Sequence, residues 1–296
     1  MNMENLLTKG MNTKKTLADF VHRGLKRVER IERDGRTWVS QVSVCPRQGA
    51  LAATFVGDSE ETAAKEFYCE FGNTAEEIIL RGWYNSGILL FADYALPDIG
   101  INLGGKIDAI VVYNGKITVA EVKTCGTKMP TKPKLTHFAQ ASLYSAITGL
   151  PYVIYYQSRN VADYGNNLKA KEFAFEFNGE ALKVNMFNAV YAHLCVEAGV
   201  MPNKYIMKND ERCGFCNFTN VCWEDGIPHM NIASSKDYEE LANLASYMTL
   251  NFMRPADVAK RRNGVVKHLS IHGTKHAVAL LGNEKGKPGK SWGEYL

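Results

Sequence analysis

GGKIDAIVVYNGKITVAEVKT, residues 104 to 124, is the stretch that decides the fold. Two runs rich in β-branched residues flank Asn114-Gly115, the dipeptide best suited to a type I′ turn between antiparallel strands. The stretch therefore predicts a β-hairpin whose strands cover residues 106–113 and 116–124.

The predicted hairpin brings two carboxylates and a lysine together. A tight turn pairs Tyr113 with Lys116, and the same register places Asp108 opposite Glu121, with Cβ atoms about 4.5 to 5.5 Å apart. Lys123 shares the strand face of Glu121 because side chains alternate along a strand. Two carboxylates this close repel unless a cation lies between them, and oxygen ligands suit Mg²⁺ or Mn²⁺. From spacing alone, Lys123 could equally offset two solvent-facing acids.

The rest of the pattern surrounds this hairpin with helices and further strands. Helices are expected to dominate the first third of the chain. One is predicted over residues 14–33, a second follows the serines within residues 38–55, and a third covers 59–84. After the hairpin the pattern predicts a helix over 134–148, strands over 151–158 and 171–177, and a helix over 179–199. We expect His137 on the surface of the helix that follows the hairpin.

Residues 229–296 are expected to form a separate basic extension. They hold ten Lys and Arg against six Asp and Glu, and their pattern predicts a helix over 236–250 followed by a hairpin over 260–282. The expected organisation is an N-terminal helix and arm over 1–37, a main domain over 38–228, and this extension.

Composition limits the function classes. The hydrophobic fraction of 46% and charged fraction of 22% are those of a soluble globular protein. No stretch approaches the roughly 20 apolar residues of a membrane span, and the first residues lack the apolar core of a secretory signal. We therefore expect a cytoplasmic protein, in the host cytoplasm if a virus encodes it, with no membrane association. A net charge of +4 permits a polyanionic partner without requiring one.

The seven cysteines are unevenly placed. In a reducing compartment they are expected to be buried thiols or metal ligands. Cys213, Cys216 and Cys222 crowd into ten residues, and Cys45 offers a fourth soft ligand from 168 residues upstream. Such a split is unusual for a zinc finger, whose ligands lie close together in sequence. The other three are expected to be packed apolar residues, namely Cys69, Cys125 and Cys195.

Asp108, the hairpin turn, then Glu121 and Lys123 form an arrangement that resembles the core motif of the PD-(D/E)XK nuclease superfamily. Gln140 and Tyr144 match the Gln-x-x-x-Tyr signature of its RecB-like exonuclease branch. The resemblance implies that the two acids bind a catalytic Mg²⁺ or Mn²⁺ and that the lysine positions water and steadies negative charge. Gln140 and Tyr144, one helical turn apart, would support the lysine and contact the DNA backbone.

The same branch usually carries Gly-x-x-x-His on an upstream helix, and the histidine completes its metal site. Here Gly72 is followed four residues later by Glu76, so a carboxylate stands at the ligand position. The resemblance thus implies Glu76 as a third metal ligand, with a preference tilted toward Mg²⁺. The alternative is that Glu76 and Glu77 are solvated helix residues.

The cysteine spacing resembles that of RecB-like nucleases with an iron-sulfur cluster, among them the CRISPR-associated exonucleases and the AddB-type helicase-nucleases. The resemblance implies a [4Fe-4S] cluster held by Cys45, Cys213, Cys216 and Cys222, with a mainly structural role in closing a very long loop. Zinc in place of iron, unligated thiols and Cys45 as a bystander stay open as alternatives.

The resemblance implies an α/β fold. It would have a restriction-endonuclease-like core in which helices flank a mixed central sheet, an N-terminal helical region and a C-terminal extension. The implied function is a metal-dependent DNA exonuclease acting on single strands or duplex ends in recombination, repair or CRISPR adaptation, with proteins of those pathways as partners and a homo-oligomer compatible with the sequence. The alternative is a catalytically weak or inactive iron-sulfur DNA-binding or scaffold subunit of a recombination complex.

Overall fold

The computed structural model describes residues 28–31, 35–54, 57–60, 63–126, 128–159, 169–204, 210–214, 216–223 and 231–274. The chain divides into two compact units. One unit comprises Met1–Glu32 and Val56–Ala75, and the other comprises Arg33–Phe55 and Glu76–Leu296. The predicted boundaries at 37 and 228 therefore do not coincide with those of the compact units.

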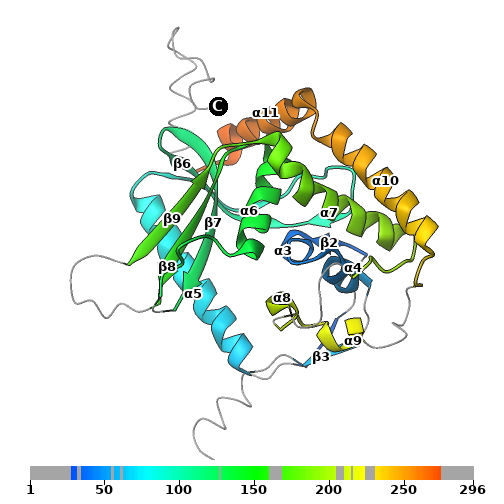
Figure 1. Cartoon of the computed structure of the whole chain (residues 1–296). Helices are drawn as coiled ribbons and strands as arrows, with labels where there is room; N and C mark the ends of the chain where they lie inside the picture. Colours follow the sequence, from blue (N-terminus) through cyan, green and yellow to red (C-terminus); the bar gives the residue numbers. More distant parts are fainter. Residues whose placement is uncertain are drawn as a thin grey trace, which may run out of the picture. The chain divides into compact units, whose positions relative to one another are not determined.

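A five-stranded mixed sheet forms the centre of the second unit (Figure 1). Its order is β4-β6-β7-β8-β9, and every neighbouring pair is antiparallel except β7 and β8, which are parallel. The strands are β4 (Leu89–Ala95), β6 (Lys106–Tyr113), β7 (Lys116–Cys125), β8 (Tyr152–Ser158) and β9 (Ala170–Phe175). Helices flank this sheet, which confirms the predicted α/β class with a mixed central sheet.

The hairpin of β6 and β7 forms as the sequence predicts. Tyr113 pairs with Lys116, and the register continues to Ala109 and Ala120. Asn114 and Gly115 have φ angles of 49° and 77°, the two positive values that a type I′ turn requires.

The helix α6 (Leu135–Thr148) connects the parallel strands β7 and β8, and α7 (Gly179–Glu197) follows β9. The Asn178 side chain accepts the backbone N–H groups of Glu180 and Ala181 and so caps α7. These bounds confirm the helices predicted over 134–148 and 179–199 and the strands predicted over 151–158 and 171–177.

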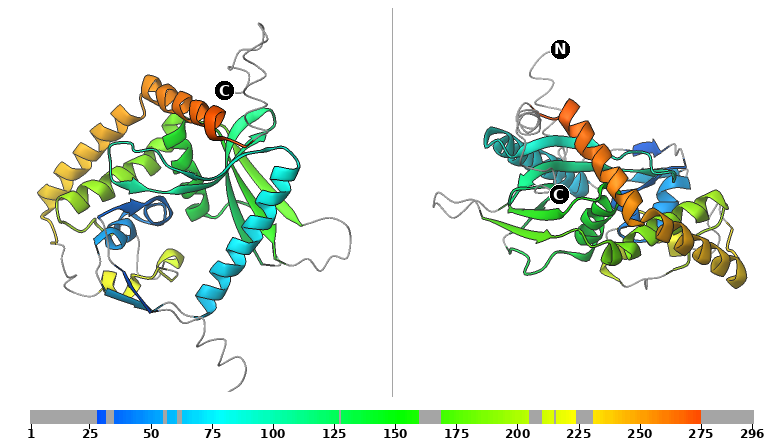
Figure 2. Two further views of the ribbon diagram at one scale, coloured as in Figure 1. Left: turned by 180° about the vertical axis from the view of Figure 1, so that it is seen from behind. Right: turned by 90° about the horizontal axis from the view of Figure 1, so that it is seen from above.

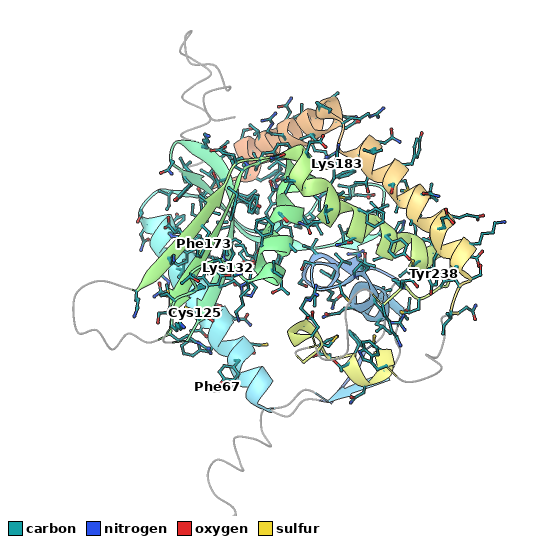
Figure 3. All side chains as sticks on the ribbon, viewed as in Figure 1. Phe67, Cys125, Lys132, Phe173, Lys183 and Tyr238 are labelled. Atoms are coloured by element: carbon teal, nitrogen blue, oxygen red, sulfur yellow. The ribbon has the colours of Figure 1, made fainter. Side chains whose placement is uncertain are left out.

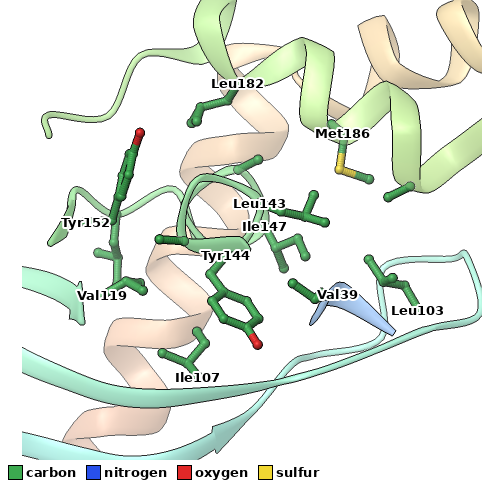
Figure 4. Close-up of a cluster of buried hydrophobic side chains, with 14 of the residues drawn as sticks. Val39, Leu103, Ile107, Val119, Leu143, Tyr144, Ile147, Tyr152, Leu182 and Met186 are labelled. Atoms are coloured by element: carbon green, nitrogen blue, oxygen red, sulfur yellow. The ribbon is translucent and has the colours of Figure 1, made fainter. Parts of the chain in front are cut away.

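The sheet carries helices on both faces. On one face, buried residues of the strands pack with α6, α7 and the C-terminal helices, as Figure 4 shows for Val119, Tyr144 and Met186. On the other face, Leu80 and Trp83 of α5 (Ala63–Asn85) pack against a smaller cluster of strand residues. Figure 3 shows side chains filling the space between the ribbons. The central strands are thus covered by helices on both faces, as the continuous apolar runs of the hairpin suggest.

The N-terminal region differs from the all-helical prediction. Short helices do form at α3 (Val39–Val42) and α4 (Pro46–Thr54), and α5 occupies most of the predicted 59–84. However, β1 (Val28–Ile31) pairs antiparallel with β3 (Gly57–Glu60), within the range predicted as a helix over 14–33, whose residues before 28 lie outside the described chain. Pairing with a distant strand overrides local helix propensity there. The strand β4 was not predicted either.

The C-terminal residues that the structure describes are helical and belong to the main core. The helix α10 (Ser235–Phe252) confirms the prediction over 236–250. The hairpin predicted over 260–282 is wrong for residues 260–272, because α11 (Pro255–His272) covers them. Residues 275–282 lie outside the described chain. Val258, Val265 and Leu269 recur at helical spacing and are buried, so burial of one face selects the helix. The segment 231–274 is therefore no separate piece.

Figure 2 shows α11 beside the helix that links the parallel strands. Gly149, with φ 73°, ends α6 at a point where an added Cβ would lie 3.0 Å from a side-chain carbon of Val258. Tyr238 of α10 (labelled in Figure 3) donates a hydrogen bond to the Met201 carbonyl at 2.7 Å. Within the described ranges no helix is long and apolar enough to cross a membrane.

Gly115 offers a direct test of the turn that sets the hairpin register. Gly115→Ala should lower the free energy of unfolding by about 1 to 2 kcal/mol, because only the positive φ opposes the new side chain and nothing lies within 4 Å of it. Gly264→Ala in the exposed face of α11 meets equally open space and should instead stabilise by up to about 1 kcal/mol. Chemical denaturation of both variants would measure this, and equal effects would refute the type I′ assignment.

Candidate active site

Asp108 lies where the β6–β7 ladder stops. Its Oδ2 accepts the backbone N–H of Val122 at 2.8 Å. The ladder ends at Ala109 and Ala120, so the expected direct pairing of Asp108 with Glu121 does not form. At this end the Asp108 side chain, in place of its backbone, takes a backbone N–H of β7. The carboxylate is thereby fixed at the opening of the hairpin.

Glu121 and Lys123 lie together on the face of β7 that packs under α6. Glu121 is completely buried, and Lys123 Nζ forms an ion pair with its Oε1. Across the described residues, Glu121 Oε2 has no hydrogen-bond partner, and the donor at Oε1 is the Lys123 ammonium group. A buried carboxylate oxygen without a donor costs free energy, which a bound cation would offset.

Glu76 is the third carboxylate of the cluster. It lies on α5 in the second unit, and the charges of both Asp108 and Lys123 act on it. Partial burial, followed by the repulsion of Asp108, raises its pKa to about 7. Glu76 is thus partly buried and within reach of the charges of Asp108 and Lys123, whereas its neighbour Glu77 is exposed to solvent.

The cluster holds more carboxyl groups than cationic groups. Burial raises the pKa of Asp108, and it raises that of Glu121 to about 8, in both cases against the charge of Lys123. Burial opposes the ammonium form of Lys123, but the charges of Glu121 and Asp108 outweigh it and raise its pKa. Three carboxyl groups around one lysine cannot all ionise cheaply, and a divalent cation with oxygen ligands would relieve this repulsion.

Gln140 and Tyr144 lie on α6 above the strands. The buried Tyr144 hydroxyl donates to the Lys106 carbonyl at 2.8 Å and lies 3.4 Å from Gln140 Nε2. Gly105 leaves room for the tyrosine ring, because an added Cβ would lie 3.2 Å from Tyr144 Cε1. Tyr144 therefore ties α6 to the start of β6, two residues before Asp108.

His137 reaches the site although it was expected on the helix surface. Tyr156 Oη accepts the backbone N–H of Lys134 at 3.1 Å and lies 2.8 Å from His137 Nδ1. Burial, followed by the charges of Lys123 and Lys134, lowers the pKa of His137 to about 3, so the imidazole is neutral. The sequence signal was its position three residues before Gln140, on the same helical face.

The four clustered cysteines line a single pocket. Cys45 precedes α4, and the others come from α8 (Glu211–Gly214), the following turn and α9 (Thr219–Trp223). Burial, with repulsion from the thiols of Cys216 and Cys222, raises the pKa of Cys45 to about 11. The structure therefore joins Cys45 to the other three and does not leave it apart as a bystander.

Arg47, which the sequence suggested for a channel that binds the DNA backbone, instead lines this cysteine pocket. Only 7% of it is exposed, and its guanidinium donates to Cys222 Sγ at 3.1 Å and to the Pro202 carbonyl at 2.8 Å. The backbone N–H of Gln48 donates to Cys45 Sγ at 3.2 Å. Such donors favour the thiolate form that binds metals. The signal was the Cys-Pro-Arg triplet at residues 45 to 47.

The two donor sets suit different groups. As their side chains are placed among the described residues, no group of three or more His, Cys, Asp or Glu could hold a metal ion. The carboxylate cluster offers hard oxygen donors with an unpartnered buried oxygen, which fits Mg²⁺ or Mn²⁺. The cysteine pocket offers four soft donors with N–H groups directed at two sulfurs, which fits an iron-sulfur cluster or zinc.

No protein-family model matches this chain, and no curated protein matches it. Among solved structures, one titled "Crystal structure of SSO0001" is similar, with a TM-score of 0.41 and 16% sequence identity. That similarity covers 65% of this chain and 88% of the other.

The raised pKa of Glu76 predicts a pH dependence of stability in the metal-free protein. The folded protein binds the Glu76 proton more tightly than the unfolded chain does. The contribution of Glu76 to the free energy of unfolding is therefore fully present below about pH 4.5 and is lost as the pH rises through about 7. In Glu76→Gln the free energy of unfolding should fall less over this pH range, by on the order of 1 kcal/mol, because solvent screens part of the effect. Thermal unfolding in chelator across this range measures it.

Glu77→Gln is the matched control, because it removes an exposed carboxyl one position along the same helix. It should leave the pH dependence unchanged. If Glu76→Gln and Glu77→Gln gave the same profile, Glu76 would not face the buried carboxylates.

Proposed function

We propose that this protein is a metal-dependent deoxyribonuclease that hydrolyses phosphodiester bonds in DNA, as an exonuclease on single strands or duplex ends. The observation that carries the proposal is the buried Glu121 carboxylate, which is ion-paired to Lys123 through one oxygen, has no donor at the other oxygen and is repelled by the charge of Asp108. A purely structural ion pair would have no need of the second buried acid, and a buried like-charged pair is costly.

Asp108, Glu121 and Glu76 would hold Mg²⁺ or Mn²⁺. The ion would act as a Lewis acid on the scissile phosphate and lower the pKa of a bound water. In the hydrolysis a water oxygen bonds to phosphorus, the bond to the leaving sugar oxygen breaks, and that oxygen gains a proton. The three carboxylates contribute by fixing the position of the water relative to the phosphate.

Lys123 contributes charge and hydrogen bonds. The charges of Glu121 and Asp108 raise the pKa of Lys123, which favours its ammonium form. Its ammonium group, held by Glu121, would orient the attacking water and stabilise the negative charge that grows on the phosphate. Tyr144 and Gln140 keep this geometry by tying α6 to β6.

We propose further that Cys45, Cys213, Cys216 and Cys222 hold a [4Fe-4S] cluster. Bound there, the cluster would fasten α4 to the short helices that follow α7, which lie more than 150 residues away in sequence, and would add to the apolar contacts between Leu51 and Phe218. Its role would be structural, since Asp108 and Lys123 belong to other elements.

The setting is proposed from the same chemistry. DNA would be the partner, the location cytoplasmic, and the pathway recombination, repair or CRISPR adaptation, with proteins of those pathways and further copies of this chain as candidate partners. The competing function is an iron-sulfur scaffold subunit that binds DNA without cutting it, and the preserved set of Asp108, Glu121 and Lys123 argues for catalysis.

Cleavage of end-labelled single-stranded DNA in Mn²⁺ tests the nuclease. Asp108→Ala and Lys123→Met should each lower the rate at least about 100-fold, because each removes a group that acts on developing charge. Glu77→Ala should retain full activity, since its side chain faces solvent. Equal rates for all four proteins would rule out this active site. Binding of DNA with no cleavage by the wild type would support the scaffold function instead.

Metal analysis of anaerobically purified protein tests the cysteine pocket. The wild type should be brown and contain iron and sulfide in nearly equal amounts, and Cys45→Ser should lose both. Cys69→Ser, at an exposed position outside the pocket, should retain them. Colourless wild-type protein with one equivalent of zinc would refute the cluster while keeping the four ligands.

A further inference from the structure

A groove beside the carboxylate cluster is not used by the proposed chemistry. It runs along the loop between β4 and β6, and its lining includes Arg36, Trp38, Leu96, Asp98, Asn102 and Lys106. We propose that this groove binds one nucleotide of a single-stranded DNA next to the scissile phosphate, with its base stacked on Trp38. The proposal rests on the proposed nuclease function and adds a substrate subsite to it.

Trp38 is held as a fixed and accessible platform. It lies in β2 (Thr37–Trp38), which pairs parallel with β5 (Leu103–Gly104). The backbone N–H and the hydroxyl of Thr37 both donate to the Asn102 carbonyl, at 3.0 and 3.2 Å. The indole nevertheless remains 38% exposed, although Trp is usually well buried. A surface tryptophan on a rigid strand loses little entropy when a base stacks on it.

Gly104 sets the position of the ring. A Cβ at this residue would lie 3.1 Å from Trp38 Cε3 and 2.6 Å from Arg36 Cδ, so both side chains pack directly on the glycine backbone. The Arg36 guanidinium carbon lies 6.0 Å from the centroid of the indole ring. The ring is thus flanked by backbone and by a cation, and its remaining surface is directed outward.

The groove is continuous with the carboxylate cluster through Lys106. Lys106 Nζ forms a 2.7 Å ion pair with Asp93, and the charges of Glu76 and Asp108 also act on it. Lys106 therefore lies both in the groove lining and at the edge of the proposed metal site. A strand whose phosphate reached Asp108 would pass Lys106 and bring its neighbouring base to the groove.

The chemistry of the lining favours a nucleotide. The lining holds two cationic residues, Arg36 and Lys106, and the Arg36 guanidinium lies over the Trp38 ring. The acidic group of the lining, Asp98, is turned to the local backbone, where its Oδ1 accepts the Gly100 N–H at 2.9 Å. Phosphates suit the cations, and any base can stack on the indole, so the subsite would tolerate all sequences.

Binding of a fluorescently labelled single-stranded oligonucleotide, in chelator and at fixed salt, tests the subsite. The measurements use the Asp108→Ala protein so that binding is separated from cleavage. Adding Trp38→Ala should weaken binding about five- to 100-fold, and adding Trp38→Phe should restore most of it, because a smaller ring still stacks. Tyr247→Ala, at an exposed aromatic residue of α10, is the matched control and should leave binding unchanged.

The outcomes separate the subsite from the nuclease. Thermal unfolding checks that the Trp38 variants fold, and Trp38→Phe carries the comparison if Trp38→Ala does not. Loss of binding with Trp38→Ala and recovery with Trp38→Phe would support stacking. Unchanged binding by the Trp38 variants would overturn the subsite, while Mn²⁺-dependent cleavage by wild type would keep the nuclease proposal intact. Absence of oligonucleotide binding by the Asp108→Ala protein would also overturn the subsite.

Discussion

The ion pair between Glu121 and Lys123, buried in a central strand beneath α6, is the constraint on which the rest of the structure depends. Burying a carboxylate that has Lys123 as a donor at one oxygen and no donor among the described residues at the other costs free energy, and one lysine does not offset the two further acids nearby. The surrounding fold must therefore supply enough stability to keep these groups in place. The apolar clusters on both sheet faces do so.

The same packing fixes the geometry of the site. The Asp108 carboxylate accepts the Val122 N–H at the end of the hairpin where the two strands are no longer paired. Tyr144 links α6 to β6 by donating to the Lys106 carbonyl. These two hydrogen bonds connect the two strands and the crossover helix into one frame. A cation placed there would meet ligands that are already immobile, which is the condition for electrostatic stabilisation without reorganisation. The cysteine pocket offers the opposite donor type, with soft sulfurs beside a buried guanidinium.

The predictions from sequence failed where a distant partner decides the local structure. The range 260–282 reads as a hairpin because of its β-branched residues and glycines, yet α11 forms up to His272 because Val258, Val265 and Leu269 meet the core. His137 reads as a surface residue, and only the fold of α6 over β8 brings it to Tyr156. The strand β4 pairs with β6 at the edge of the sheet, and no feature of its local sequence indicates that pairing.

The sequence by itself determined the hairpin, its turn and its register, because Asn-Gly and β-branched runs act over a few residues. It also indicated the carboxylates and cysteines of the two candidate sites, because their spacing carries chemical information. Only the tertiary structure decided that the charge of Asp108 acts on Glu76, that Cys45 joins a pocket with cysteines at least 168 residues away, and that Arg47 contacts Cys222. Contacts between segments so far apart depend on how the whole core packs, and no local pattern specifies them.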